Sequence, residues 1–444
     1  MTTRFDDAWS KALSLARVAA DATRLDVVLV RDVLGRVSLV IDDSPGEPHG
    51  EYVQTLGDTL AAGTQPFTAP AGVTLASTLF APDQVLLARD LVIVLERTEN
   101  GGRVSTLERG VIGAEWLHPR PDIASATHRV TLYGFKGGVG RSSAAFMLAQ
   151  RLASHGRCVL VVDLDLESPG VGSLLHNDDD LPDYGLVDYL AESAVDNAGG
   201  LDLVTKSQTV RASGNGEVWV APAGGRPRLR YEYLAKLNRV YLDLPASTPG
   251  GAPRSLANRL ESAIDVCEQR VAELSRRPDM TLIDSRAGIH DIAAIAITQL
   301  ADISLLFATD SPATWDGYRE LFRQWGSVPE RAKLIRERLH MVAAMVPRDR
   351  RDAYLEAFRD HSQSCFAATL YDDVASSDEE AGDLARFNFA PGDESAPHAP
   401  LPIFFAPDLV ALDAAARRDW HEIDPGAYSA FLDGAMELIV GDQL

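Results

Sequence analysis

The sequence predicts an α/β protein with a mostly parallel, doubly wound sheet and a small α+β domain at its N-terminus. From residue 129 onward, short apolar runs rich in β-forming residues alternate with longer amphipathic segments, the pattern of a parallel sheet built from strand–helix–strand units. A glycine-rich turn follows the first of these runs, and aspartates end two others. The expected division is 1–105 for the N-terminal domain, 106–128 for a linker and 129–444 for the α/β domain.

The first apolar run, 130–133, leads directly into a loop that contains Gly134, Gly137, Gly138 and Gly140. Glycine takes positive φ easily and lets the backbone approach a ligand, so this loop can turn its N–H groups inward. A helix is predicted over 144–154, and the N-terminus of a helix favours an anion. Strand, loop and helix together predict a phosphate cradle in a sheet of the P-loop NTPase type.

The loop departs from the common P-loop pattern G-x-x-x-x-G-K-[ST] at two positions. Phe135 stands where the first glycine is expected, and Arg141 stands where the lysine is expected. Ser142 keeps the hydroxyl that binds Mg²⁺ in such loops. Arginine can neutralise phosphate oxygens in a bidentate manner, but its planar guanidinium is broader than an ammonium group. The sequence therefore favours nucleotide binding over fast hydrolysis.

Composition and charge narrow the classes of partner. The 444 residues carry a formal net charge of −22. Nonspecific DNA binding gains from a basic face through counterion release, and no cluster of Lys and Arg here is large enough to provide one.

The three cysteines are isolated, which favours free thiols in a reducing cytoplasm. No apolar run approaches a membrane span and residues 1–24 are not a signal peptide, so a cytoplasmic protein without membrane contact is expected.

The run from Lys136 to Ser143, K-G-G-V-G-R-S-S, resembles the deviant Walker A loop of the ParA/MinD-type (SIMIBI class) ATPases. With arginine in place of the Walker A lysine, it is similar to a variant branch that carries K-G-G-x-G-R. The resemblance implies an ATP and Mg²⁺ site and a switch between monomer and ATP-dependent homodimer. It also implies that Lys136 reaches the phosphates of the partner subunit. The expected nucleotide-binding residues are Gly137, Gly138, Val139, Gly140, Arg141, Ser142, Ser143 and Gly288.

Carboxylates follow two predicted strands. The strand predicted over 158–162 is followed by Asp163 and Asp165. They stand at its carboxyl end, where open α/β sheets bind ligands. In the resembled family this D-x-D opens switch I, which implies that Asp165 orients the attacking water and Asp163 lies near the magnesium shell. The run 280–284 ends in Asp284, which is typical of a Walker B carboxylate that holds Mg²⁺ through its water shell.

These patterns and the resemblance together define the candidate site. The expected metal-binding residues are Ser142, Asp163 and Asp284. The expected catalytic residues are Asp165, Lys136 and Arg141. Gly288, just beyond the Walker B run, stands where a backbone N–H can sense the γ-phosphate.

Two features leave alternatives open. Arg286 belongs to a D-S-R-A-G run that is common in the variant branch, and it can pair with Asp284, pair with Glu167 or face phosphate. The resembled family often has an adenine-reading asparagine near the end of the strand predicted here over 339–346, and this chain has none. The preference between ATP and GTP is therefore open.

The predicted function is an ATP-binding switch, a slow Mg²⁺-dependent ATPase, whose dimer state regulates an unidentified protein partner, in the manner of bacterial signalling or defence proteins. One alternative is a module in which Arg141 has stopped hydrolysis and the nucleotide only gates assembly. Another is a structural domain with an empty site, which the retained acids and Lys136 disfavour. The N-terminal domain is expected to be a sensor or docking domain.

Overall fold

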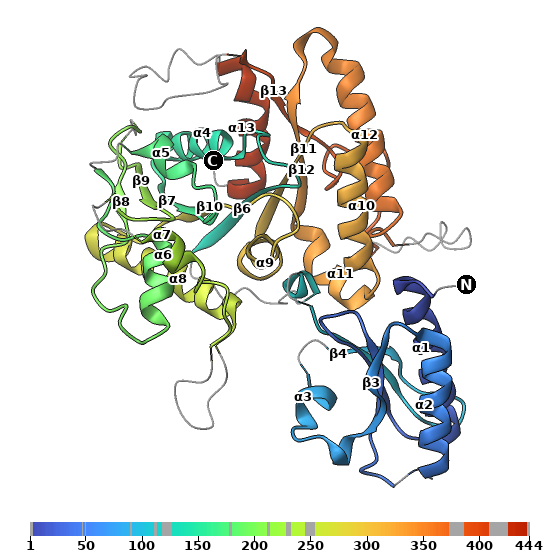
Figure 1. The fold of residues 1–444 in the computed structure, drawn as a ribbon. Coiled ribbons are helices and arrows are strands. Elements are labelled where there is room, and N and C mark those ends of the chain that lie inside the picture. Colours follow the sequence, from blue (N-terminus) through green and yellow to red (C-terminus); the bar gives the residue numbers. More distant parts are fainter. Residues whose placement is uncertain are drawn as a thin grey trace. The chain divides into compact units, whose positions relative to one another are not determined.

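The computed structural model describes residues 3–46, 48, 50–88, 91–110, 113–117, 127–176, 180–210, 214–227, 232–244, 254–372, 386–407 and 425–441. The chain divides into two compact units, Met1–Leu117 and His118–Leu444 (Figure 1). The predicted fold class is confirmed, because the second unit contains a large, mostly parallel sheet and the first contains a smaller mixed one. No helix in the described ranges is long and apolar enough to cross a membrane.

The first unit is a five-stranded sheet in the order β3-β2-β1-β5-β4. The central strand β1 pairs antiparallel with β2 and parallel with β5. Helices α1 and α2 cover one face, and α1 packs closely because its buried side chains are alanines. The elements are α1 (Phe5–Thr23), β1 (Val27–Arg31), β2 (Val37–Ile41), α2 (Gly50–Thr64), β3 (Thr68–Leu75), α3 (Asp83–Leu86), β4 (Leu91–Leu95) and β5 (Val104–Glu108).

Strand β5 crosses the boundary that the sequence placed at residue 105. Val104 and Leu107 are fully buried against the neighbouring strands, so the polypeptide up to Leu117 belongs to the first unit. The segment 106–128 is thus only partly a connection between the units. Of this segment, residues 111–112 and 118–126 lie outside the described residues.

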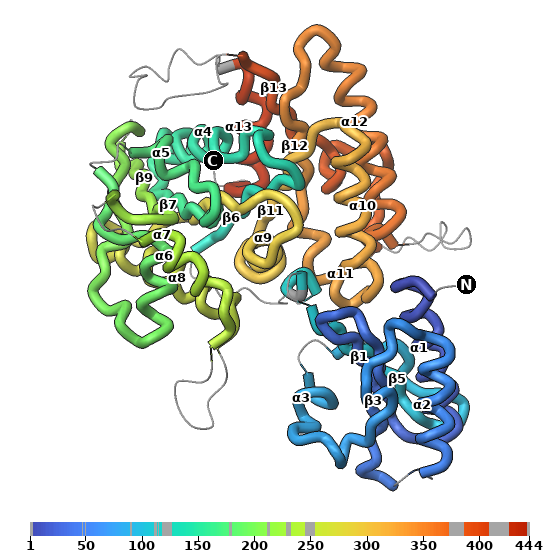
Figure 2. The backbone as a smooth tube through the Cα atoms, in the orientation of Figure 1, coloured from blue at the N-terminus to red at the C-terminus, as the bar shows by residue number. Residues whose placement is uncertain are grey.

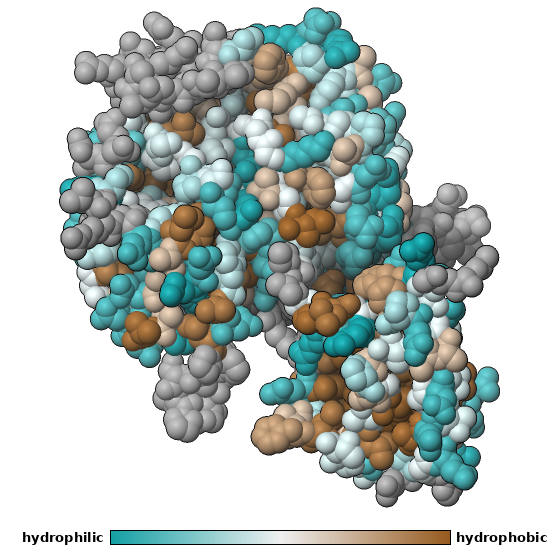
Figure 3. Space-filling view, viewed as in Figure 1, coloured by the Kyte–Doolittle hydropathy of each residue, from teal (hydrophilic) through white to brown (hydrophobic). Residues whose placement is uncertain are grey.

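The two faces of this smaller sheet are covered unequally. Within the described residues, the face opposite α1 and α2 carries a small buried cluster under α3 and its neighbouring turns. Large apolar side chains at Phe80, Leu87, Ile93 and Val94 are exposed in this part of the chain. Figure 3 shows apolar surface over the region of β3 and α3.

The second unit contains an eight-stranded sheet in the order β13-β12-β11-β6-β10-β7-β9-β8. All neighbouring strands are parallel except β8 and β9. The strands are β6 (His128–Gly134), β7 (Cys158–Asp163), β8 (Thr205–Lys206), β9 (Glu217–Ala221), β10 (Met280–Asp284), β11 (Ile303–Ala308), β12 (Leu339–Val346) and β13 (Leu401–Phe404). Because β10 lies between β6 and β7, the carboxyl ends of these three strands meet at one edge.

Helices cover both faces of the large sheet. In β7, Val159 and Val161 face one core with α4 and α13, whereas Leu160 and Val162 face another with α6, α8 and α9. Figures 1 and 2 show α4 and α13 together on one side of the sheet. The helices are α4 (Arg141–Ser154), α5 (Val171–Leu175), α6 (Leu186–Ser193), α7 (Tyr233–Leu237), α8 (Leu256–Leu274), α9 (Asp291–Ile295), α10 (Pro312–Gly326), α11 (Pro329–Ile335), α12 (Arg351–Ala367) and α13 (Pro425–Val440).

Candidate nucleotide-binding site

The glycine loop connects the end of β6 to the first turn of α4. Strand β6 ends at Gly134 and α4 begins at Arg141. Gly138 and Gly140 have φ of 74° and 83°, in the left-handed region where side chains with a Cβ are strained. The loop and the helix start therefore have the arrangement that the sequence predicts for a phosphate cradle.

The loop is anchored from two sides. The ring of Phe135 lies against Gly317 of α10, where an added Cβ would stand 2.2 Å from the ring, and it is 5.9 Å from the ring of Tyr318. On the other side, the N–H of Gly288 donates to the carbonyl oxygen of Gly134 at 3.2 Å. The Gly288 N–H is therefore engaged with the loop backbone.

Ser142 and Asp284, two of the expected metal-binding residues, are in direct contact. The Ser142 hydroxyl donates to Oδ2 of Asp284 at 2.5 Å. Asp284 is buried, and its Oδ1 has no hydrogen-bond partner. Asp163 stands opposite Asp284 in the register of β7 and β10. The sheet order thus places the two carboxylates side by side.

Asp163 is directed toward the backbone that follows it. Its Oδ1 accepts the N–H of Asp165 at 3.2 Å, and its Oδ2 accepts the N–H groups of Gly170 and Gly172 at 3.1 and 3.4 Å. The side chain is completely buried. Asp163 therefore holds the loop after β7 in place, whatever it contributes to a metal shell.

The three acids share a buried corner with the guanidinium of Arg141. Burial raises the pKa of Asp284 to about 6. Burial and the neighbouring Asp284 raise the pKa of Asp163 well above its ordinary value. Burial also raises the pKa of Asp165, against the opposing effect of Arg141 and Arg286. Desolvated carboxylates with free oxygens are a site that gains from a cation.

The corner fits a magnesium ion held largely by phosphate and water. Ser142 and Asp284 supply a hydroxyl and a free carboxylate oxygen on neighbouring elements. Within the described ranges, no three His, Cys, Asp or Glu side chains gather in a metal-binding cluster. Mg²⁺ commonly uses one or two protein carboxylates and keeps several waters, so it does not require such a cluster.

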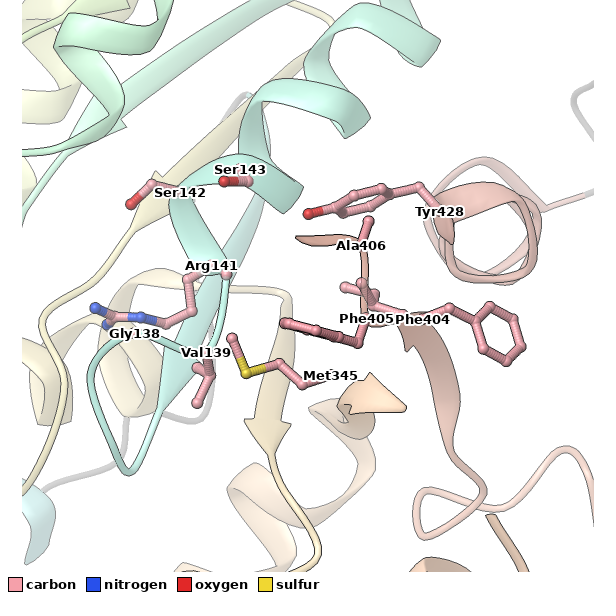
Figure 4. A pocket seen from close by; sticks show the side chains of 12 residues that line it. Gly138, Val139, Arg141, Ser142, Ser143, Met345, Phe404, Phe405, Ala406 and Tyr428 are labelled. Carbon is pink, nitrogen blue, oxygen red and sulfur yellow. The ribbon is translucent and has the colours of Figure 1, made fainter. Parts of the chain in front are cut away.

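Arg141 turns away from the open side of the loop. Its guanidinium is buried, donates to the carbonyl oxygen of Ser285 and lies 3.4 Å from Oδ2 of Asp165. Figure 4 shows it directed away from the cavity beside the loop. The arginine that replaces the Walker A lysine therefore contacts the segments after β7 and β10.

Two other cations have different surroundings. Arg286 forms an ion pair with Glu167. Of the three roles left open by the sequence, the structure therefore contains the pairing with Glu167. Nε2 of His290 lies 3.7 Å from the same carboxylate. Lys136 is exposed, and no carboxylate in the described part of the chain forms an ion pair with it. It is the loop cation that remains accessible from outside.

A cavity of about 350 Å³ opens beside the loop, within the usual size range of small-molecule sites. Figure 4 shows Met345 and Phe405 opposite Val139, and Tyr428 directed toward Ser143. The lining residues are Gly138, Val139, Gly140, Arg141, Ser142, Ser143, Met345, Ile403, Phe404, Phe405, Ala406 and Tyr428.

The far wall of this cavity was not identified from the sequence. Met345 is near the end of β12 with φ of 57°, and Phe405 directly follows β13. Their position at carboxyl ends of strands is a signal in principle, but it requires the strand order. Tyr428 comes from α13, and nothing in the sequence links that helix to the loop.

Comparison with known proteins gives one family and several similar structures. Residues 130–375 match the CobQ/CobB/MinD/ParA nucleotide binding domain. No curated protein matches the chain. Similar structures include pNOB8 ParA bound to nonspecific DNA, at 15% identity over 71% of this chain and 97% of that one, with a TM-score of 0.41. The MinC:MinD cell division complex of Aquifex aeolicus is 16% identical over 70% of this chain and 96% of that one, with a TM-score of 0.38. MinD with Mg-ADP from Pyrococcus horikoshii OT3 is 18% identical over 70% of this chain and 96% of that one, with a TM-score of 0.40.

Proposed function

The chain belongs to the CobQ/CobB/MinD/ParA nucleotide-binding domain family, and from that premise we propose that it is a Mg²⁺-dependent ATP switch. In this proposal ATP binding drives homodimer formation, and the dimer engages a protein partner. The observation that carries the proposal is the corner where the glycine loop, the Ser142 hydroxyl and the unpartnered oxygen of Asp284 meet.

The loop and the first turn of α4 bind the phosphates, with backbone N–H groups directed at the oxygens. Ser142 and Asp284 hold the magnesium ion, which when bound neutralises phosphate charge. The nucleoside lies in the cavity between the loop and the wall formed by Met345, Phe405 and Tyr428. Among the described residues that line this cavity there is no side-chain amide, so we expect ATP and GTP to bind with similar affinity.

Asp165 positions the water in slow hydrolysis of ATP to ADP and phosphate. Its Oδ1 is buried without a hydrogen-bond partner, so it can accept a hydrogen bond from water. The contact between Arg141 and Asp165 also favours the second candidate, a module that binds nucleotide without hydrolysing it. A phosphate-release assay on wild type and Asp165→Ala separates the two, because only a true ATPase loses turnover in the variant.

Dimerisation is proposed from the two loop cations. Arg141 faces the interior, whereas Lys136 is exposed, so the two side chains point in different directions from one loop. A two-fold dimer uses both, because each Lys136 can enter the phosphate site of the other subunit. The exposed Lys136 supports this arrangement.

Isothermal titration with ATP, in the presence and absence of Mg²⁺, tests the binding site. We expect Ser142→Ala to lower the gain in affinity from Mg²⁺ by at least about tenfold, because the variant lacks a metal ligand. Ser143→Ala is the matched control, since the Ser143 hydroxyl contacts Tyr428 and its loss should leave the magnesium dependence unchanged. Equal affinity with and without Mg²⁺ in wild type would overturn the assignment.

A further inference from the structure

Two arginines link the same two segments, the one after β7 and the one after β10. Arg141 reaches across from the first turn of α4 to the carbonyl oxygen of Ser285 and to Asp165. Arg286 forms the outer link, to Glu167. Asp165 and Glu167 follow β7, whereas Ser285 and Arg286 follow β10. The link through Arg141 also includes the phosphate loop, because Arg141 begins the helix that follows this loop.

We propose that Arg141 is a clasp that ties these two segments together, and that phosphate releases it. Phosphate oxygens then replace the Asp165 carboxylate and the Ser285 carbonyl as acceptors of the guanidinium. Arg141 is thus a positioning residue for Asp165 that couples nucleotide occupancy to both segments. The release step rests on the proposed function, whereas the clasp itself rests on the contacts of Arg141 with Ser285 and Asp165.

The geometry favours an exchange of partners over a permanent ion pair. The guanidinium is 3.4 Å from Asp165, whose other carboxylate oxygen has no partner, so the pair is incompletely satisfied. A buried guanidinium needs acceptors in every state, and phosphate offers short, bidentate, charge-assisted hydrogen bonds. Both sets of acceptors are therefore suitable for the same buried cation.

The shape of arginine explains why lysine cannot replace it in this role. A guanidinium presents several N–H groups in a fixed plane, so one side chain can hold a carbonyl and a carboxylate from different segments. An ammonium group is a single point of charge and cannot span both in that geometry. The substitution Arg141→Lys should therefore preserve a positive charge near phosphate while opening the clasp.

Hydrogen–deuterium exchange of the full chain without nucleotide tests the clasp directly. We expect Arg141→Lys to speed amide exchange at least about fivefold in residues 164–172 and 285–291, with β7 and β10 unchanged. The control is Arg151→Lys, the same substitution on the same helix, where the exposed side chain pairs with Asp433; it should leave both segments unchanged. Unchanged exchange in both segments of Arg141→Lys would overturn the proposal, as would faster exchange spread over the strands.

Titration with ADP in the absence of Mg²⁺ tests the release. Asp165→Asn removes the charge that competes with phosphate for the guanidinium, so we expect affinity for ADP to rise about tenfold. The same substitution in an Arg141→Lys background should have little effect, because the clasp is already open. An equal or weaker affinity in Asp165→Asn would overturn the exchange of partners. If the wild-type protein binds no nucleotide, the proposed function is refuted. The hydrogen–deuterium exchange experiment then tests the clasp independently of nucleotide binding.

Discussion

Two buried arginines lie at opposite ends of the sheet that carries the site, and their surroundings differ. Arg129, at the start of β6, donates to both oxygens of Glu268 at 2.9 and 3.0 Å and to Asp265 at 2.6 Å. Glu268 also accepts a hydrogen bond from Thr281 at 2.8 Å. This end of the sheet contains a completed ion-pair network.

Arg141 lies at the carboxyl end of the same strands, among groups that are only partly satisfied. Oδ1 of Asp165, Oδ1 of Asp284 and the hydroxyl of Ser285 are buried without hydrogen-bond partners. A buried polar atom without a partner costs about 1–3 kcal/mol. Arg129 has its partners within the chain, whereas Arg141 lies beside groups that a ligand could satisfy, as the proposed phosphate site requires.

The largest expected effect comes from removing the completed pair. Arg129→Met should lower the free energy of unfolding by about 3–5 kcal/mol, because Glu268 stays buried without its partner. Arg141→Met should lower it by less than half as much, since Asp165 is already poorly paired and can take up a proton. Urea denaturation of both variants measures the difference. Equal losses would contradict the distinction between the two arginines.

Neutralising one carboxylate at each end should have opposite effects on stability. The pKa of Asp284 rises from 3.8 to about 6 on burial, so the folded chain binds a proton there more tightly than the unfolded chain does. Stability from this group is therefore lost as the pH rises from about 4 to 6, and the charged form destabilises the fold above that range. At pH 8, Asp284→Asn should stabilise the nucleotide-free chain by on the order of 2 kcal/mol.

The advantage of Asp284→Asn should disappear below pH 4, where the wild-type carboxyl group is protonated. Glu268→Gln is the matched variant at the other end, and it should destabilise the chain at pH 8 because it removes the charge that Arg129 requires. Urea midpoints across this pH range measure both effects. Destabilisation by Asp284→Asn at pH 8 would show that the carboxylate corner is as complete as the Arg129 network.

The smallest effect on stability is expected at Lys136, which is exposed and belongs to neither network. Lys136→Ala should change the free energy of unfolding by less than about 0.5 kcal/mol. Titration should show nucleotide binding to the monomer largely intact, whereas analytical ultracentrifugation with ATP should show no dimer. A loss of monomer binding would place Lys136 in its own chain's phosphate site.

The sequence predicted the local elements of the site well because each has a local signal. The strand expected over 339–346 has those bounds in the structure, and those over 158–162 and 280–284 differ by at most one residue. The ParA/MinD-type family inferred from the glycine loop is confirmed. Assignment to the branch with arginine in the Walker A position stays a prediction.

The features that depend on strand order and side-chain direction were beyond the sequence. The pairing of Asp163 with Asp284 follows from β10 lying beside β7, which no local pattern indicates. Arg141 turns inward because Ser285 and Asp165 offer acceptors there. Strand β5 was missed because its apolar residues are few, although its position beside β1 buries them.

Light scattering tests the nucleotide switch most directly, with the chain measured in ATP, in ADP and without nucleotide, all with Mg²⁺. Asp165→Ala is the most informative variant because it cannot leave the ATP state by hydrolysis. We expect its mass to double with ATP but not with ADP, and wild type to show a weaker form of the same change. The same mass in all three conditions would contradict the switch.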